Sequence, residues 1–294
     1  MLWNAPLAAR TAGEGFVVAM LAQEYYQLTE RNHRLVFCFA AIHLKSAWVM
    51  TCAFETKENT IVAAGGLDNV CSLYTVSAAT SGNDKPICEL AQHDGYLACC
   101  EFIGPDKILT SSGDSTCIMW DINSGAAEAV MSDHAGDVMC VAVCPTNPAV
   151  FVSGSCDATA KMWDLRTRSA VHTFSGHESD INTVQWMSTG YSFGTGSDDT
   201  QCKIFDTRAH FPVAEFADNS ALASIISLDF SQSGRLLFAG NDNSGCVVWD
   251  TLGSPVAPVD VLMSHTNRVS SVRTAPSGQA LGTASWDTTL IVYA

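Results

Sequence analysis

From residue 45 onward, short runs of β-forming residues recur between clusters of small and polar residues. Examples are VMCVAV at 138–143, FVSGS at 151–155 and AKMWDL at 160–165. Val, Ile and aromatic residues bounded by Gly, Ser, Asn and Asp are typical of short strands joined by turns. After the opening residues, no stretch has a convincing helical period of apolar positions. The pattern therefore predicts an all-β chain.

The strands belong to a repeat in which small residues, an Asp and a few β-formers lead to an aromatic residue. Its six copies read GGLDNVCSLY (65–74), SSGDSTCIMW (111–120), GSCDATAKMW (154–163), GSDDTQCKIF (196–205), GNDNSGCVVW (240–249) and ASWDTTLIVY (284–293). The closing aromatics lie 42 to 46 residues apart. Four short strands in each such unit are typical of one blade of a β-propeller.

Each repeat carries residues that predict a hydrogen-bond network. A turn Asp that is nearly buried needs donors, and an upstream His, a Ser or Thr on the second strand and the indole N–H of Trp can supply them. In the third unit the sequence leaves Ser153 and Ser155 open as the hydroxyl. Catalysis by such a set is the weaker interpretation, because a catalytic set would not be copied from blade to blade. The structural set is His93, Asp114, Trp120, His134, Asp157, Trp163, His177, Asp199, His265 and Asp287.

Two units depart from this pattern. Ala217 and Asn243 replace both the His and the Asp of the fifth unit, and Lys45 takes the His position of the first. The last repeat ends at its third strand (290–294), so its fourth strand must come from elsewhere. We expect 35–44 either to close a six-bladed ring or to be the remnant of a seventh blade.

Composition and charge narrow the function. The net charge is −15, which repels phosphate backbones and makes nucleic-acid binding unexpected. The 12 cysteines are scattered without metal-binding spacing, and no phosphate loop, nucleophile elbow or acid–base pair stands outside the repeat. We therefore expect no enzyme activity, no cofactor and no metal. The early apolar run 16–22 is too short to span a membrane, so a cytoplasmic protein is expected.

These repeats resemble the WD40 repeat family. Several sequence segments, including WVMTCAF (48–54), SGHESDIN (175–182) and TGSDDTQCKIFD (195–206), resemble segments of the beta subunits of heterotrimeric G proteins, which belong to this family. The resemblance implies a seven-bladed WD40 β-propeller preceded by a helix that pairs with a gamma subunit. Here six repeats are recognisable, in 41–294, and 1–40 is a divergent segment without helix heptads. The sequence therefore leaves pairing with gamma open.

The register of the repeats also predicts a contact surface. Residues three and five places after the His, and the residue before the turn Asp, should gather around one mouth of the channel. They mix aromatic, Met and Leu side chains with carboxylates, as at the centre of a protein interface. The resemblance implies that this face binds the alpha subunit and effectors, with peripheral membrane location through partners. Another WD40 adaptor, associated with ribosomes or a ubiquitin ligase, is the alternative. The candidate contact residues are Trp48, Met50, Leu67, Asn69, Tyr96, Asp137, Met139, Asp180, Asn182, Asp198 and Trp286.

Overall fold

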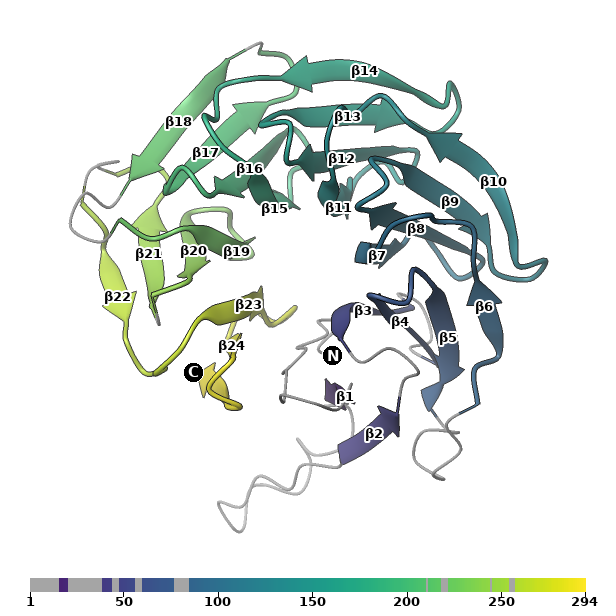
Figure 1. Cartoon of the computed structure of the whole chain (residues 1–294). Helices are drawn as coiled ribbons and strands as arrows, with labels where there is room; N and C mark the ends of the chain where they lie inside the picture. The colour runs from purple at the N-terminus through teal and green to yellow at the C-terminus, as the bar shows by residue number, and fades with distance from the viewer. Residues whose placement is uncertain are drawn as a thin grey trace.

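Six β-sheets surround a common centre in the computed structural model of the chain (Figure 1). The structure describes residues 16–20, 39–43, 48–55, 60–76, 85–209, 211–217, 222–243, 245–253 and 257–294. All of the elements with assigned bounds in these ranges are β-strands, which confirms the all-β prediction. The six sheets correspond one for one to the six repeats, so the described part of the chain is a six-bladed β-propeller.

Each blade is an antiparallel sheet in which the strands follow chain order from the centre outward. The first three blades comprise β3 (Val49–Phe54), β4 (Ile61–Gly66), β5 (Cys71–Thr75) and β6 (Cys88–Leu90); β7 (Leu97–Phe102), β8 (Lys107–Ser112), β9 (Cys117–Asp121) and β10 (Ala126–Met131); and β11 (Val138–Val143), β12 (Val150–Ser155), β13 (Ala160–Asp164) and β14 (Ser169–Phe174). The last three comprise β15 (Ile181–Trp186), β16 (Ser192–Ser197), β17 (Gln201–Asp206) and β18 (Pro212–Ala217); β19 (Ile225–Phe230), β20 (Leu236–Asn241), β21 (Cys246–Asp250) and β22 (Asp260–Leu262); and β23 (Val269–Thr274), β24 (Leu281–Ser285) and β25 (Leu290–Tyr293).

The hydrophobic core lies between neighbouring blades. Trp163 of the third blade, for example, is fully buried and belongs to one core cluster with Leu109 and Met119 of the second blade. Close approach of the blades requires small residues on the second strand. A Cβ atom at Gly154 would lie 2.6 Å from Ile181 Cγ2 of the next blade, so no larger side chain fits without movement. This packing makes the ring a rigid support for the turns at its ends.

In the described part of the chain, the ring has a gap between its last and first blades (Figure 1). Strands β23 to β25 form a sheet of three strands, and β1 (Phe16–Met20) pairs with β2 (Phe39–His43) in a separate sheet that Figure 1 shows in the gap. The expectation that 35–44 would close the ring on the last blade is therefore wrong for the described part, β2. Its partner is the nearby β-prone segment FVVAM. The interpretation as a remnant of a seventh blade stays a prediction. Among the described residues, we find no helix with the length and apolarity needed to cross a membrane.

Candidate binding face

A hydrogen-bond chain fixes the turn of the third blade. His134 Nδ1 donates to Asp157 Oδ2 at 2.8 Å, and its Nε2 lies 2.7 Å from Ser153 Oγ. Trp163 Nε1 donates to the same oxygen at 2.8 Å. The sequence left two serines open, and the structure places Ser153 in this chain while Ser155 Oγ donates to a loop carbonyl. Because Nδ1–H points at the carboxylate, the neutral His must accept the Ser153 proton at Nε2.

The second, fourth and sixth blades repeat this geometry. The His–Asp distances are 2.8 Å for His93–Asp114, 2.6 Å for His177–Asp199 and 2.9 Å for His265–Asp287. A Thr takes the hydroxyl position in all three: Thr110, Thr195 and Thr283. Trp120 Nε1 adds a bond to Thr110 at 2.8 Å.

The two departing units behave differently from the others. In the fifth unit, the side chain of Asn241 replaces the missing pair by accepting hydrogen bonds from the backbone N–H groups of Asn243 and Gly245. In the first unit, Lys45 lies outside the described residues, and the buried Oδ1 of Asp68 accepts no hydrogen bond in the described structure. The turn can therefore form without the full network.

Hydrogen bonds and burial together determine which groups of the network are charged. Burial alone would raise the pKa of Asp157, but hydrogen bonds from Thr159, His134 and the N–H of Ala135 outweigh burial and lower the pKa to about 2. Burial lowers the pKa of His134 despite its acidic partner. A carboxylate held by a neutral imidazole therefore stabilises the turn, and no proton needs to move in this arrangement.

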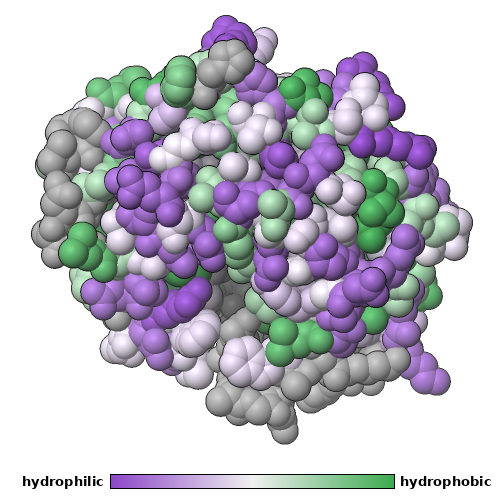
Figure 2. Space-filling view, turned by 45° about the horizontal axis from the view of Figure 1, so that its top comes forward, coloured by the Kyte–Doolittle hydropathy of each residue, from purple (hydrophilic) through white to green (hydrophobic). Residues whose placement is uncertain are grey.

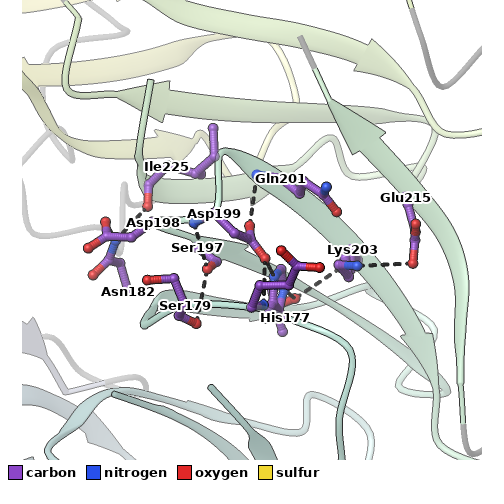
Figure 3. A network of polar contacts seen from close by, with 12 residues as sticks. His177, Ser179, Asn182, Ser197, Asp198, Asp199, Gln201, Lys203, Glu215 and Ile225 are labelled. Atoms are coloured by element: carbon purple, nitrogen blue, oxygen red, sulfur yellow. Dashed lines mark hydrogen bonds and ion pairs between the residues drawn. The ribbon is translucent and has the colours of Figure 1, made fainter. Parts of the chain in front are cut away.

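Consecutive residues of the turn point in opposite directions. In Figure 3, Asp199 points toward His177, while Asp198 points toward Asn182, whose Nδ2 donates to Asp198 Oδ1 at 2.6 Å. The residue after the turn Asp has a left-handed backbone in five units, with φ between 62° and 70°. Sequence reasoning missed this feature, because these residues are chemically unlike: Asn69, Ser115, Ala158, Thr200 and Thr288. The fixed turn presents its preceding residue on the surface.

Two exposed hydrophobic sites result. Trp48 and Leu67 are 50% and 52% exposed and adjacent, since Leu67 N donates to Trp48 O at 3.2 Å. Trp286 is 37% exposed and lies under the guanidinium of Arg268, which is 5.1 Å from its ring centroid. On the side drawn in Figure 2, hydrophobic residues stand among hydrophilic ones instead of forming one continuous patch.

Acidic residues lie at the same end of the third and fourth blades, and one of them is bonded to the second blade. Tyr96 OH donates to Asp137 Oδ2 at 2.9 Å and lies 3.3 Å from Met139 Sδ. Burial, reinforced by the hydrogen bond to Asp137, raises the pKa of Tyr96, so the phenol stays protonated. Asp198 N donates to Asp180 O at 3.0 Å across the neighbouring turn.

Cys156 belongs to the same surface, although the sequence analysis did not include it. Burial raises the pKa of its thiol to about 12, and the carboxylates of Asp180, Asp137 and Asp198 contribute. Its position directly before the turn Asp is equivalent to that of Leu67, and this was the signal that could have found it. The thiol is therefore an uncharged member of an acidic surface.

Of the remaining candidates, two methionines line the channel and Asn69 belongs to a turn. Met50 and Met139 line a channel of about 590 Å³ together with Asn182, Arg268 and Trp286. Asn69 is half-buried in the left-handed position of the first turn. In the described residues, no group of three or more His, Cys, Asp or Glu side chains is arranged to hold a metal ion.

The repeats, the blades and the His–Asp turns together define a WD-repeat β-propeller that presents a mixed aromatic and acidic face at one end. A family model described as G protein beta WD-40 repeat protein matches residues 32–294. The chain belongs to this family.

Curated relatives are similar over most of this chain. Guanine nucleotide-binding protein subunit beta of Arabidopsis thaliana is 44% identical over 269 residues, covering 86% of this chain and 71% of the relative. The subunit beta of Nicotiana tabacum is 43% identical over 270 residues, covering 86% and 72%. Subunit beta-5b of Danio rerio is 45% identical over 258 residues, covering 86% and 64%. These relatives favour the G protein interpretation over another WD40 adaptor.

Proposed function

We propose that the chain is a non-catalytic scaffold of G protein-coupled receptor signalling that binds a G protein alpha subunit through the turn end of its blades. We call this surface the docking face. Effectors that bind the same residues would compete with the alpha subunit, and such partners would bring the chain to the inner face of the plasma membrane. The docking face consists of Trp48, Met50, Leu67, Asn69, Tyr96, Asp137, Met139, Asp180, Asn182, Asp198 and Trp286.

The observation that supports this proposal most directly is the exposure of three large hydrophobic residues on backbone that is already ordered. Trp48, Leu67 and Trp286 are each more than one third exposed. The hydrogen bond between His265 and Asp287 fixes the turn beside Trp286. The turn beside Leu67 is held by backbone hydrogen bonds, from Leu67 N to Trp48 O and from Asn69 N to Gly66 O. Binding then costs little conformational entropy, because the backbone of the face need not be ordered when a partner docks. Exposed Trp residues on a rigid surface are typical interaction hot spots.

The carboxylates of the docking face indicate the charge of the partner. Asp137, Asp180 and Asp198 lie on two adjacent blades, where all three carboxylates act on the Cys156 thiol. A partner segment that joins apolar side chains with Lys or Arg would complement this face. Such pairs at the rim mainly raise the association rate, so binding should weaken as the salt concentration rises.

A direct binding measurement tests the proposal. GDP-loaded alpha subunit is immobilised, and binding of the wild-type chain is compared with that of Trp48→Ala and Val171→Ala. Val171 is 55% exposed on outer strand β14, so its substitution also removes exposed apolar surface, but away from the docking face. We expect Trp48→Ala to weaken binding at least tenfold and Val171→Ala to leave it unchanged. Equal binding by all three proteins would exclude the docking face, and no binding by the wild type would exclude the alpha subunit as partner.

A further inference from the structure

Charged side chains occupy one level of the central channel. The six inner strands β3, β7, β11, β15, β19 and β23 are equivalent, and each pairs with the second strand of its blade in the same register pattern. At their fifth position, two strands carry Ala and the other four carry polar or charged residues. These four are Glu101, Gln185, Asp229 and Arg273. Such residues are uncommon in an inner strand and need partners.

A cavity of about 390 Å³ opens at this level. The last residues of β7, β11, β15 and β19 and the turns that follow them line it. Because the inner strands begin at the docking face and run away from it, the cavity lies at the opposite end of the channel. Its walls combine the carboxylates of Glu101 and Asp229 with apolar groups of Ile103, Val143 and Pro145. We call it the Glu101 cavity.

Asp229 supplies a fixed negative charge at the cavity. Asp229 is only 6% exposed, and its Oδ1 accepts hydrogen bonds from Gln185 Nε2 at 3.2 Å and from the N–H of Phe230 at 2.8 Å. The N–H and hydroxyl of Thr274 donate to its other oxygen at 2.6 and 2.9 Å. These four bonds hold the carboxylate in place and connect the fourth, fifth and sixth blades. Asp229 therefore adds negative electrostatic potential to the cavity, but its oxygens already accept these hydrogen bonds and do not serve as the free acceptor for a ligand.

Glu101 supplies the free acceptor. Its Oε2 accepts a hydrogen bond from Val143 N at 2.9 Å, and no described contact uses Oε1. Burial raises the pKa of Glu101 to about 7, and the Val143 N–H and the Arg273 guanidinium only partly oppose this effect. Arg273 itself donates to the carbonyl of Leu228 at 3.4 Å. The positive charge of Arg273 therefore only partly balances the negative charge of the buried Glu101 carboxylate.

The neighbouring titratable groups do not supply the missing charge. Burial raises the pKa of the Cys99 thiol to about 11, and a hydrogen bond with Cys71 and burial raise that of Cys100, so both thiols are neutral at pH 7. Asp229 has the same sign as Glu101. An anion at this place would face two carboxylates, and a neutral apolar ligand would leave Glu101 without a counter-charge.

We propose that the Glu101 cavity binds an organic cation whose ammonium or guanidinium group donates to Glu101 Oε1 and whose aliphatic stem lies against Ile103, Val143 and Pro145. A charge-assisted hydrogen bond in a partly buried site is strong enough to select the cation. The apolar wall favours an alkyl stem over a hydrated inorganic ion. The cation can be a free amine or a basic side chain of a protein, and the site is independent of the docking face.

Calorimetric titration with n-butylammonium at pH 8 tests this proposal, with n-butanol as the neutral ligand of equal length. Glu101→Gln removes the charge and keeps an acceptor for Val143 N, whereas Glu128→Gln removes an equal charge from outer strand β10 of the same blade. We expect wild type and Glu128→Gln to bind n-butylammonium more tightly than n-butanol. Glu101→Gln should bind n-butylammonium at least tenfold more weakly. Binding should also weaken from pH 8 to pH 6, because protons then compete for Glu101.

Several outcomes would overturn the proposal. These are equal binding of n-butanol and n-butylammonium, unchanged affinity of Glu101→Gln for n-butylammonium, or no binding heat when n-butylammonium is added to the wild type. A carbon-13 titration of the wild-type Glu101 carboxyl avoids dependence on the variant, since bound amine must lower its pKa; an unchanged pKa contradicts the proposal. The affinities of spermidine and of a blocked Gly-Lys-Gly peptide are then compared. Tighter binding of spermidine identifies the natural cation as a free amine, and tighter binding of the peptide identifies it as a basic protein side chain.

Discussion

Removing the buried hydroxyl of Ser153 should destabilise the third blade more than the loss of one hydrogen bond would, because two side chains share this oxygen. Ser153 is fully buried, and its oxygen contacts both His134 Nε2 and Trp163 Nε1. Ser153→Ala therefore leaves two buried polar atoms without a partner. Each such atom costs about 1–3 kcal/mol, so the free energy of unfolding should fall by about 2–6 kcal/mol. The whole stability of a domain is on the order of 5–15 kcal/mol, so the variant should still fold.

Urea denaturation followed by circular dichroism measures this loss, provided the slope of free energy against urea is unchanged. Ser169→Ala is the control, because the exposed Ser169 hydroxyl donates only to Thr167, and it should stay within about 0.5 kcal/mol of wild type. Trp163→Phe should cost less in the Ser153→Ala background than in the wild type, because it removes one of the two unpaired groups. A loss below about 0.5 kcal/mol for Ser153→Ala would refute the network as a source of stability.

Three further results are expected. Acid should destabilise the fold in two stages, because the contribution of His134 is complete above its ordinary pKa of 6.5 and lost below it, while that of Asp157 is complete above 3.8 and lost toward pH 2. The pKa values of Asp114, Asp199 and Asp287 are also lowered, so Asp157→Asn should make the second stage smaller in a pH series of urea midpoints without removing it. A second stage of unchanged size would argue against the assignment. Thr288→Gly should raise the free energy of unfolding by up to about 1 kcal/mol, because the left-handed backbone there (φ 68°) suits glycine better than a residue with a Cβ atom. A lower midpoint temperature of thermal unfolding for the variant would contradict this. Cys202 and Cys246, with pKa values raised to about 12 by burial, should react with iodoacetamide only after unfolding, and rapid labelling of the native protein would disagree.

The repeat was readable from the sequence because each blade is built from local pairings. The closing aromatic, the turn Asp and the upstream His recur at nearly constant spacing, so the six repeats followed from the chain alone, and each of them forms one blade. Whether the ring has six or seven blades did not follow from the repeats. The choice between Ser153 and Ser155 did not follow, because residues two apart on a strand share a face. Their three-dimensional register decides it: Ser153 lies opposite Lys161 of the third strand, and Ser155 opposite Val138 of the first.

Features that depend on contacts between blades were beyond the sequence. Glu101 and Asp229 are far apart in the chain, and only the arrangement of consecutive blades around the channel brings them to one cavity. The partner of β2 was also misjudged. An open edge on the last blade suggested a distant pairing, but β1 offers a nearby apolar strand in antiparallel register from Phe16–His43 to Met20–Phe39. Closing a shorter loop costs less entropy, which favours this local sheet.

Hydrogen exchange of the chain with and without GDP-loaded alpha subunit tests the central proposal most directly. The docking face predicts slower exchange on binding in the peptides around Trp48, Tyr96, Met139 and Trp286. The outer strands, such as β14 and β18, should exchange at the same rate in both samples. Protection confined to the outer strands, with the turn end of the blades unchanged, would contradict this assignment of the binding surface.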